Sequence, residues 1–224
     1  MTWVKICGMT SLEDALTAVE AGADAVGFVF YEKSPRNISV EAAREIVEKL
    51  PESVEKVGVF VGAGPEAVAE VSRRSGLTVA QIYPGAPFAL NDEFLNSLPC
   101  RVIAAISTGV VGGHEVSGFY VPDEVRDRVV AALVDSGNSE NPGGTGVAFD
   151  WENWEGMARL MNRMDLKLVV AGGLTPKNVS EAMGILKPWG VDVASGVEAR
   201  PGKKDPKKVR AFVKAVRDAD RKTS

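Results

Sequence analysis

The chain has few of the residues that build disulfide frameworks or metal sites. Its 224 residues include two cysteines, Cys7 and Cys100, and one histidine, His114. Cysteines this far apart imply no disulfide framework, and a reducing cytoplasm is the simpler expectation. One histidine and two separated cysteines cannot supply a usual zinc set, so we expect no metal of this kind. A loose magnesium site made of carboxylates stays open.

Long apolar runs and clustered positive charge are also missing. Residues 1–5 lack the apolar run of a signal peptide, and no stretch approaches the length of a membrane span. The net charge is −4 and no basic block occurs, which argues against a nucleic-acid partner. We therefore expect a soluble, cytoplasmic protein that needs neither a membrane nor nucleic acid. An anionic ligand would have to be held by local donors.

What the chain does have is a strict alternation of short apolar segments and amphipathic helical segments. The apolar segments are continuous, which is typical of strands buried on both faces. An open doubly wound sheet would also alternate, but it usually needs fewer units, so we predict one (β/α)8 barrel domain over residues 1–224. Residues 107–118 are expected to form a loop. The strands are expected at residues 3–7, 24–30, 54–61, 78–82, 101–106, 129–134, 168–171 and 191–194, and helices at 11–21, 39–50, 65–75, 91–98, 150–164, 176–186 and 206–220.

Two glycine turns stand directly after the last two predicted strands. The first holds Gly172 and Gly173, and the second holds Ser195 and Gly196. Glycine lets backbone N–H groups approach a ligand closely, and the start of a helix favours an anion. In a barrel, these two loops frequently form a phosphate site. The turns therefore predict a phosphorylated small molecule as the ligand.

Two reactive side chains end predicted strands, where the catalytic face of a barrel lies. Cys7 ends the first strand and has an alternative reading as an inert core residue. At the mouth of the barrel, close to Lys5 or Arg36, its thiol would lose its proton more readily and serve as a general base. A role as nucleophile is the alternative, but no histidine partner is available for the usual pairing. Asp135 ends the sixth strand and has an alternative reading as a turn cap. The thirteen-residue loop from Ser136 to Ala148 favours a lid, and desolvation under it would suit a general acid.

Other polar residues near strand ends are candidates for binding. Arg36 is either a solvated loop charge or a planar clamp for a substrate carboxylate. Tyr83 follows the fourth predicted strand, and Asp192, inside an apolar strand, is expected to lie hydrogen-bonded within the barrel. Lys203 and Lys204 are expected to be solvated.

Six segments occur in order along the chain, and together they closely resemble the phosphoribosylanthranilate isomerases, the (β/α)8 enzymes of tryptophan biosynthesis. The resemblance spans residue 3 to about residue 205. The first and last segments are its most specific parts. The segments are KICGMT (5–10), GFVF (27–30) with SPR (34–36), LVDS (133–136), GGTG (143–146) with FDW (149–151), AGGL (171–174) and DVASGVE (192–198).

The resemblance implies an Amadori rearrangement of N-(5-phosphoribosyl)anthranilate to 1-(2-carboxyphenylamino)-1-deoxyribulose 5-phosphate, with no cofactor. It makes Asp135 the general acid, Cys7 the general base and Arg36 the holder of the anthranilate carboxylate. It also places the phosphate on the backbone around Gly172, Gly173, Ser195 and Gly196.

One residue departs from the family pattern. Tyr83 stands where the family usually has histidine, and we expect its hydroxyl to substitute as a hydrogen-bond donor. The alternatives are the related aminoaldose isomerase of histidine biosynthesis, which has aspartate in place of Cys7, and a non-catalytic barrel that binds a phosphorylated ligand. The protein is expected to be a monomer or a homodimer.

Overall fold

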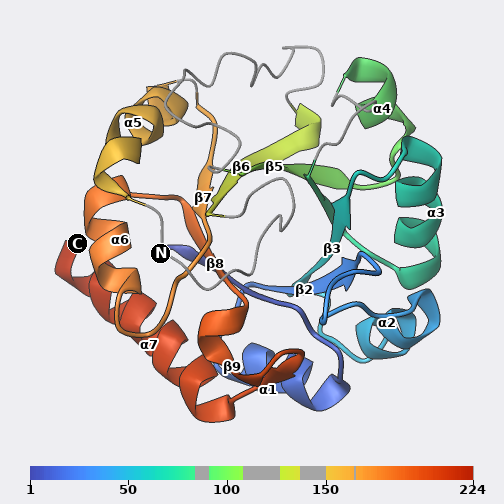
Figure 1. Ribbon diagram of the computed structural model, residues 1–224, viewed down its shortest axis with the longest axis horizontal. Coiled ribbons are helices and arrows are strands. Elements are labelled where there is room, and N and C mark those ends of the chain that lie inside the picture. Colours follow the sequence, from blue (N-terminus) through green and yellow to red (C-terminus); the bar gives the residue numbers. More distant parts are fainter. Residues whose placement is uncertain (84–90, 108–126, 137–149, 164, 224) are drawn as a thin grey trace.

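The fold is a closed barrel of eight parallel strands, as the alternating pattern predicts (Figure 1). It was obtained as a computed structural model, which describes residues 1–83, 91–107, 127–136, 150–163 and 165–223. Each strand pairs with the next one in the chain, and β8 closes the ring on β1. The strands are β1 (Trp3–Cys7), β2 (Ala25–Phe30), β3 (Glu55–Val61), β4 (Val79–Tyr83), β5 (Arg101–Ser107), β6 (Val129–Asp135), β7 (Leu168–Val170) and β8 (Gly190–Val193).

Helices surround the ring of strands (Figure 1). Their starts follow local chemistry: the side chains of Ser11 and Ser39 accept hydrogen bonds from the backbone N–H groups of Asp14 and Ala42, which stabilises the first turns of two helices. The helices are α1 (Leu12–Glu20), α2 (Val40–Val47), α3 (Pro65–Ser75), α4 (Asp92–Ser97), α5 (Glu155–Arg163), α6 (Val179–Leu186) and α7 (Pro206–Thr223), with the short 3-10 helices η3 (Glu152–Trp154) and η4 (Ser195–Val197).

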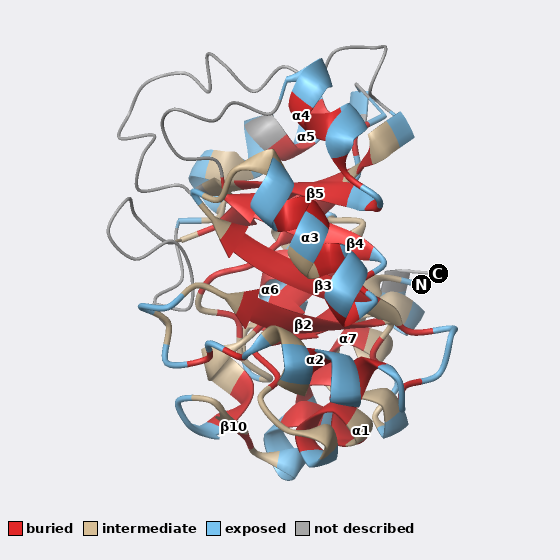
Figure 2. Ribbon diagram, turned by 90° about the vertical axis from the view of Figure 1, so that its right-hand side faces the viewer, coloured by how far each residue is buried: buried red, intermediate tan, exposed pale blue. Residues whose placement is uncertain are grey.

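The strands are buried on both faces, and the helices expose only their outer faces (Figure 2). Side chains alternate between the two sides of each strand. Ile6 and Ile82 lie in the core between strands and helices, whereas Cys7 and Tyr83 belong to the cluster inside the barrel. Within each apolar run, side chains therefore alternate between the barrel interior and the helix-facing side, although the sequence itself shows no alternation of polarity. Every second residue of a strand faces the interior, and at the strands' carboxyl ends some of these residues are polar.

Several segments differ from the sequence-based expectation. Helix α6 begins at Val179 and not at residue 176, because the Asn178 side chain first accepts a hydrogen bond of 2.7 Å from the Thr175 N–H in a turn. The helix expected at 150–164 is divided into η3 and α5. A hairpin of β9 (Glu198–Arg200) and β10 (Lys203–Lys204) follows η4 and was not predicted.

Part of the expected organisation lies outside the described residues. This holds for residues 108–118 of the expected loop, with His114, and for the glycine-rich loop after Ser136. Within the described part of the chain, no helix combines the length and apolarity that crossing a bilayer requires.

Candidate active site

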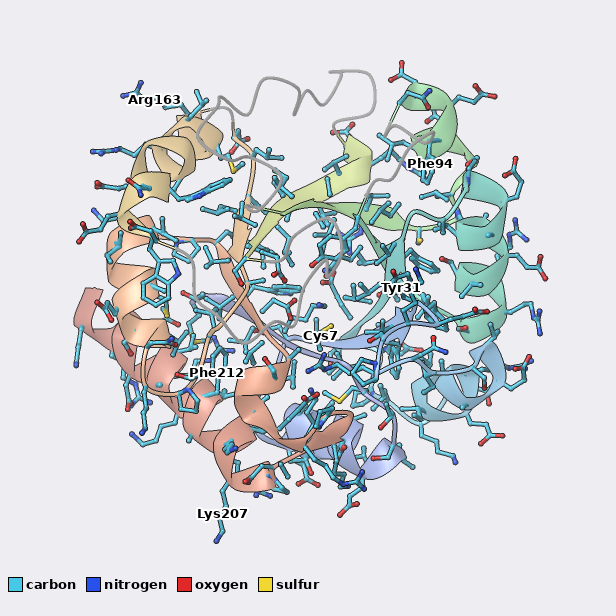
Figure 3. The ribbon with its side chains drawn as sticks, viewed as in Figure 1. Cys7, Tyr31, Phe94, Arg163, Lys207 and Phe212 are labelled. Atoms are coloured by element: carbon cyan, nitrogen blue, oxygen red, sulfur yellow. The ribbon has the colours of Figure 1, made fainter. Side chains whose placement is uncertain are left out.

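The two predicted proton-transfer residues lie at the carboxyl ends of β1 and β6, in the same end of the barrel interior. Cys7 and Asp135 are 6% and 5% exposed, and Cys7 lies inside the ring of strands (Figure 3). Tyr83, at the end of β4, lies near both: its hydroxyl donates a hydrogen bond of 3.2 Å to Asp135 Oδ2, and its side chain belongs to the same interior cluster as Cys7. The structure therefore gathers these three residues in one buried cluster.

The Cys7 thiol lies beside a buried ammonium group. Lys5 is two residues earlier on β1, so both side chains face the barrel interior. Lys5 is fully buried, and its Nζ donates a hydrogen bond of 2.9 Å to Asp192 Oδ2, across the β1–β8 pairing. Asp192 thus lies hydrogen-bonded in the barrel, as predicted. Burial lowers the pKa of Lys5, but the charge of Asp192 and the hydrogen bonds to Asp192 and Cys7 outweigh it and raise that pKa.

The pKa of the Cys7 thiol differs from the sequence-based expectation, which was a thiol that loses its proton more readily. Burial raises the pKa of the thiol, although the nearby Lys5 charge acts in the opposite direction. Without substrate, Cys7 is therefore mostly a neutral thiol at neutral pH. Gly27, its register partner on β2, makes room for it, because a Cβ on Gly27 would lie 2.7 Å from Cys7 Sγ. From the sequence, this glycine was named only as part of a segment shared with the family, and its packing role was not predicted.

Arg36 is engaged by a carboxylate of the protein itself. Its Nε and Nη2 each donate a hydrogen bond of 2.8 Å to one oxygen of Glu198. Lys204 also contacts Glu198, at 3.0 Å, and is 1% exposed. The prediction that Lys204 is solvated is therefore wrong, because the β9–β10 hairpin folds it back over this carboxylate. Arg36 still lies within electrostatic reach of Cys7, so the guanidinium borders the same cluster.

Replacing Glu198 by glutamine should destabilise the protein by about 3–5 kcal/mol, because it leaves the buried charges of Arg36 and Lys204 without their counter-ion. Urea unfolding measures this loss. Glu48→Gln is the matched control: Glu48 pairs with Arg44 on the surface, where both side chains are more than half exposed, so its loss should be below about 1 kcal/mol. Equal, small losses in both variants would contradict the assignment.

The stabilisation from Glu198 should also depend on pH. Burial raises the pKa of Glu198, but the hydrogen bonds and charges of Arg36 and Lys204 outweigh it and lower that pKa. The stabilising contribution is then complete above the ordinary glutamate pKa and is lost as the pH falls through the lower value of the folded state. The acid side of the stability–pH curve should accordingly be flatter in Glu198→Gln.

The two glycine turns meet at the same end of the barrel. Gly172 and Gly173, after β7, have φ angles of 78° and 64°, which strongly favour glycine. Gly196, in η4 after β8, packs so closely that a Cβ there would collide with the carbonyl oxygen of Leu174. The backbone of one turn thus touches the backbone of the other. That the two turns bind a phosphate stays a prediction.

Two further residues of the cluster were not among the predicted site residues. Gln81 lies two residues before Tyr83 on β4, and its Nε2 donates a hydrogen bond of 3.4 Å to the Tyr83 hydroxyl. Lys5 was named only as a neighbour of the thiol. The sequence did offer a signal for both residues: each lies two positions before a predicted site residue on the same strand, so its side chain faces the same side of the strand. No group of three or more His, Cys, Asp or Glu side chains suited to a metal occurs within the described part of the chain.

Comparison with known proteins identifies the family. The family model for N-(5'-phosphoribosyl)anthranilate isomerase matches residues 4–215. The isomerase of Trichlorobacter lovleyi is 44% identical over 98% of this chain and 100% of its own length. That of Geobacter sulfurreducens is 41% identical over 97% of this chain and 99% of its own length.

Solved structures agree with this result. The phosphoribosylanthranilate isomerase of Thermotoga maritima superposes with a TM-score of 0.79 at 39% identity, covering 97% of this chain and all of that one. A further structure, the isomerase in complex with reduced 1-(o-carboxyphenylamino)-1-deoxyribulose 5-phosphate, has a TM-score of 0.73 at 37% identity, over 97% of this chain and all of that one. The chain belongs to the N-(5'-phosphoribosyl)anthranilate isomerase family.

Proposed function

We propose that this phosphoribosylanthranilate isomerase of tryptophan biosynthesis acts through Asp135 as general acid and Cys7 as general base. The observation that carries the assignment is the buried cluster in which Tyr83 contacts the Asp135 carboxyl and lies within electrostatic reach of the Cys7 thiol. An acid and a base at the same end of the barrel interior can act on two positions of the same small molecule. We further propose that residues 1–224 form one domain.

The reaction divides into two proton transfers. Asp135 gives its proton to the ribose ring oxygen, the bond from C1 to that oxygen breaks, and the anthranilate nitrogen forms a Schiff base with C1. Cys7 then removes the proton from C2, and the electron pair moves to give an enolamine, which tautomerises to the ketone. Lys5, beside Cys7, supplies a positive charge that stabilises the thiolate before it accepts this proton.

The remaining predicted residues hold the two ends of the substrate. The turns of Gly172–Gly173 and Ser195–Gly196 would bind the phosphate through backbone N–H groups. Arg36 would hold the anthranilate carboxylate. Because Glu198 already engages two nitrogens of Arg36, it fixes the plane of the guanidinium before substrate arrives. The sequence predicts Tyr83 as a further substrate contact, a role that a raised KM with unchanged kcat in Tyr83→Phe would show.

Replacing Gly196 by alanine should raise KM about tenfold or more, the equivalent of about 1.4 kcal/mol of binding. The new Cβ would push against the Leu174 carbonyl group, which is backbone and cannot swing aside, so the two turns of the phosphate cradle must separate. Steady-state kinetics measure the change. Gly184→Ala on α6 is the matched control, since its Cβ meets nothing within 4 Å. An unchanged KM in Gly196→Ala would show that the two turns do not contribute to substrate binding.

The direct test follows the fluorescence of phosphoribosylanthranilate as the purified chain consumes it. The aminoaldose substrate of histidine biosynthesis is tested in parallel. We expect turnover of phosphoribosylanthranilate. Turnover of the second substrate alone would favour the related aminoaldose isomerase, and binding of a phosphorylated ligand without any turnover would favour a non-catalytic barrel.

We also propose a cytoplasmic location and a monomeric or homodimeric state. Cys7 and Cys100 are both free and buried, which suits a reducing compartment. The Thermotoga maritima isomerase is described as dimeric and has been converted to monomers. Gel filtration with light scattering distinguishes the two states for this chain.

A further inference from the structure

The Gln81 side chain is fully buried inside the barrel, yet only one end of its amide is used. Gln81 is 1% exposed, and its Nε2 donates to Tyr83. Its Oε1 has no hydrogen-bond partner among the described residues, and a buried acceptor without a partner is costly. The contact to Tyr83 is long at 3.4 Å, and that from Tyr83 to Asp135 is 3.2 Å. Hydrogen bonds in active sites without substrate are often long and tighten in the complex.

The direction of this chain of hydrogen bonds depends on the proton of Asp135. When Asp135 is a carboxylate, it can only accept, so the Tyr83 hydroxyl donates to it and accepts from the Gln81 amide. When Asp135 is a neutral acid, its own proton can be donated to the Tyr83 oxygen. The Tyr83 hydroxyl must then donate elsewhere, and Gln81 Oε1 becomes its acceptor after the amide turns by half a rotation.

We infer that Gln81, Tyr83 and Asp135 form a reversible hydrogen-bond chain in which Tyr83 is a positioning residue for the general acid. The inference rests on the proposed role of Asp135 in the isomerase reaction. After Asp135 has given its proton to the substrate, the Tyr83 hydroxyl turns to the new carboxylate and stabilises it. Before that transfer, Gln81 Oε1 accepts the Tyr83 proton, and both protonation states of Asp135 are satisfied.

Other charges also face this chain. Asp192 on β8 and Cys7 on β1 lie within electrostatic reach of Tyr83, and Lys5 pairs with both. Burial and then the Asp135 charge raise the pKa of Tyr83 well above its ordinary value, so the hydroxyl keeps its proton and does not itself titrate near neutral pH. The proton that moves in this cluster is therefore that of Asp135 or Cys7.

The first test is the titration of Asp135, followed through its 13Cγ signal in aspartate-labelled protein and assigned by comparison with Asp135→Asn. In Tyr83→Phe the carboxylate loses a donor, so the midpoint should move up by about one pH unit. In Gln81→Met the acid form loses its acceptor and keeps a buried hydroxyl proton unsatisfied, so the midpoint should move down. Tyr31→Phe, which removes a tyrosine hydroxyl just after β2, is the control and should leave the midpoint unchanged.

The second test is steady-state kinetics with phosphoribosylanthranilate. Tyr83→Phe should lower kcat about tenfold and change KM less than about threefold, because the lost contact matters after proton transfer. An unmoved midpoint with unchanged kcat overturns the inference, and so does a raised KM with unchanged kcat, which would make Tyr83 a substrate contact. If the unaltered chain shows no turnover, the proposed function fails, while the Asp135 titration still decides the inference. Should Gln81→Met not fold, Tyr83→Phe alone decides it.

Discussion

Asp135→Asn is expected to lower kcat by about 10²–10⁴-fold, the usual contribution of a general acid. Asparagine has nearly the shape of aspartate and can keep the hydrogen bond to Tyr83, but it has no proton to give to the ribose ring oxygen. The loss should therefore appear in kcat, while affinity for a product analogue changes only a few-fold. Stopped-flow fluorescence and a binding titration measure the two quantities.

A matched control removes an aspartate elsewhere. Asp218→Asn on α7 breaks a surface ion pair with Lys214, whose side chain is 76% exposed, and should leave kcat unchanged. If Asp135→Asn kept more than about a tenth of the activity, proton transfer by this carboxyl would not limit the reaction, and its assignment as general acid would fall.

The architecture was predictable because the strands and helices of a parallel barrel can be recognised from local sequence patterns. Each strand, such as β3, is a short apolar run, and each following helix begins with a cap that its own sequence supplies, as Ser39 does for α2. The expected strands coincide with the observed ones to within a few residues. Errors arose where a local pattern had two readings, as at the start of α6, where a turn held by Asn178 delays the helix.

The site was predictable only in part, because its reactive residues end strands whereas their partners are set by the closure of the barrel. That Cys7 and Asp135 stand at strand ends could be predicted from the sequence. The contact of Lys5 with Asp192 joins residues 187 positions apart, and that of Arg36 with Glu198 joins residues 162 apart.

Those partners change the chemistry expected of each side chain. A loop arginine that reads as a free clamp proves to be engaged by Glu198. The Cys7 thiol, at the carboxyl end of β1, was expected to have a lowered pKa, but burial raises that pKa and favours the neutral thiol. No local pattern carries this information, since it depends on which strands become neighbours and on how much water the closed interior excludes.

Cys7→Ser is expected to lower kcat by about 10²–10⁴-fold, with substrate affinity nearly unchanged. Serine keeps the size of the side chain and fits the space that Gly27 leaves, so the interior should not rearrange. Its hydroxyl, however, is a far weaker acid than a thiol and does not ionise near neutral pH, so the proton on C2 loses its acceptor. Cys100→Ser, which changes the other buried thiol, is the matched control and should retain activity.

The pH dependence provides an independent signature of the base. Because burial raises the pKa of Cys7, only a minority of molecules carry the thiolate at neutral pH. A base acts when it is deprotonated, so kcat should climb as the pH rises from neutral into the alkaline range and past the ordinary pKa of a thiol, and this climb should be absent from the residual activity of Cys7→Ser. A flat profile in the unaltered enzyme would show that ionisation of this thiol does not control the rate.

Substrate deuterated at C2 separates the roles of the two residues. In Cys7→Ser the removal of the C2 proton becomes the slowest step, so the isotope effect on kcat should be large. In Asp135→Asn ring opening becomes the slowest step, and the isotope effect should fall towards one. The two substitutions thus lower kcat alike but move the isotope effect in opposite directions. A large effect in both variants would mean that Asp135 acts in the proton removal itself, and the division of labour between acid and base would have to be redrawn.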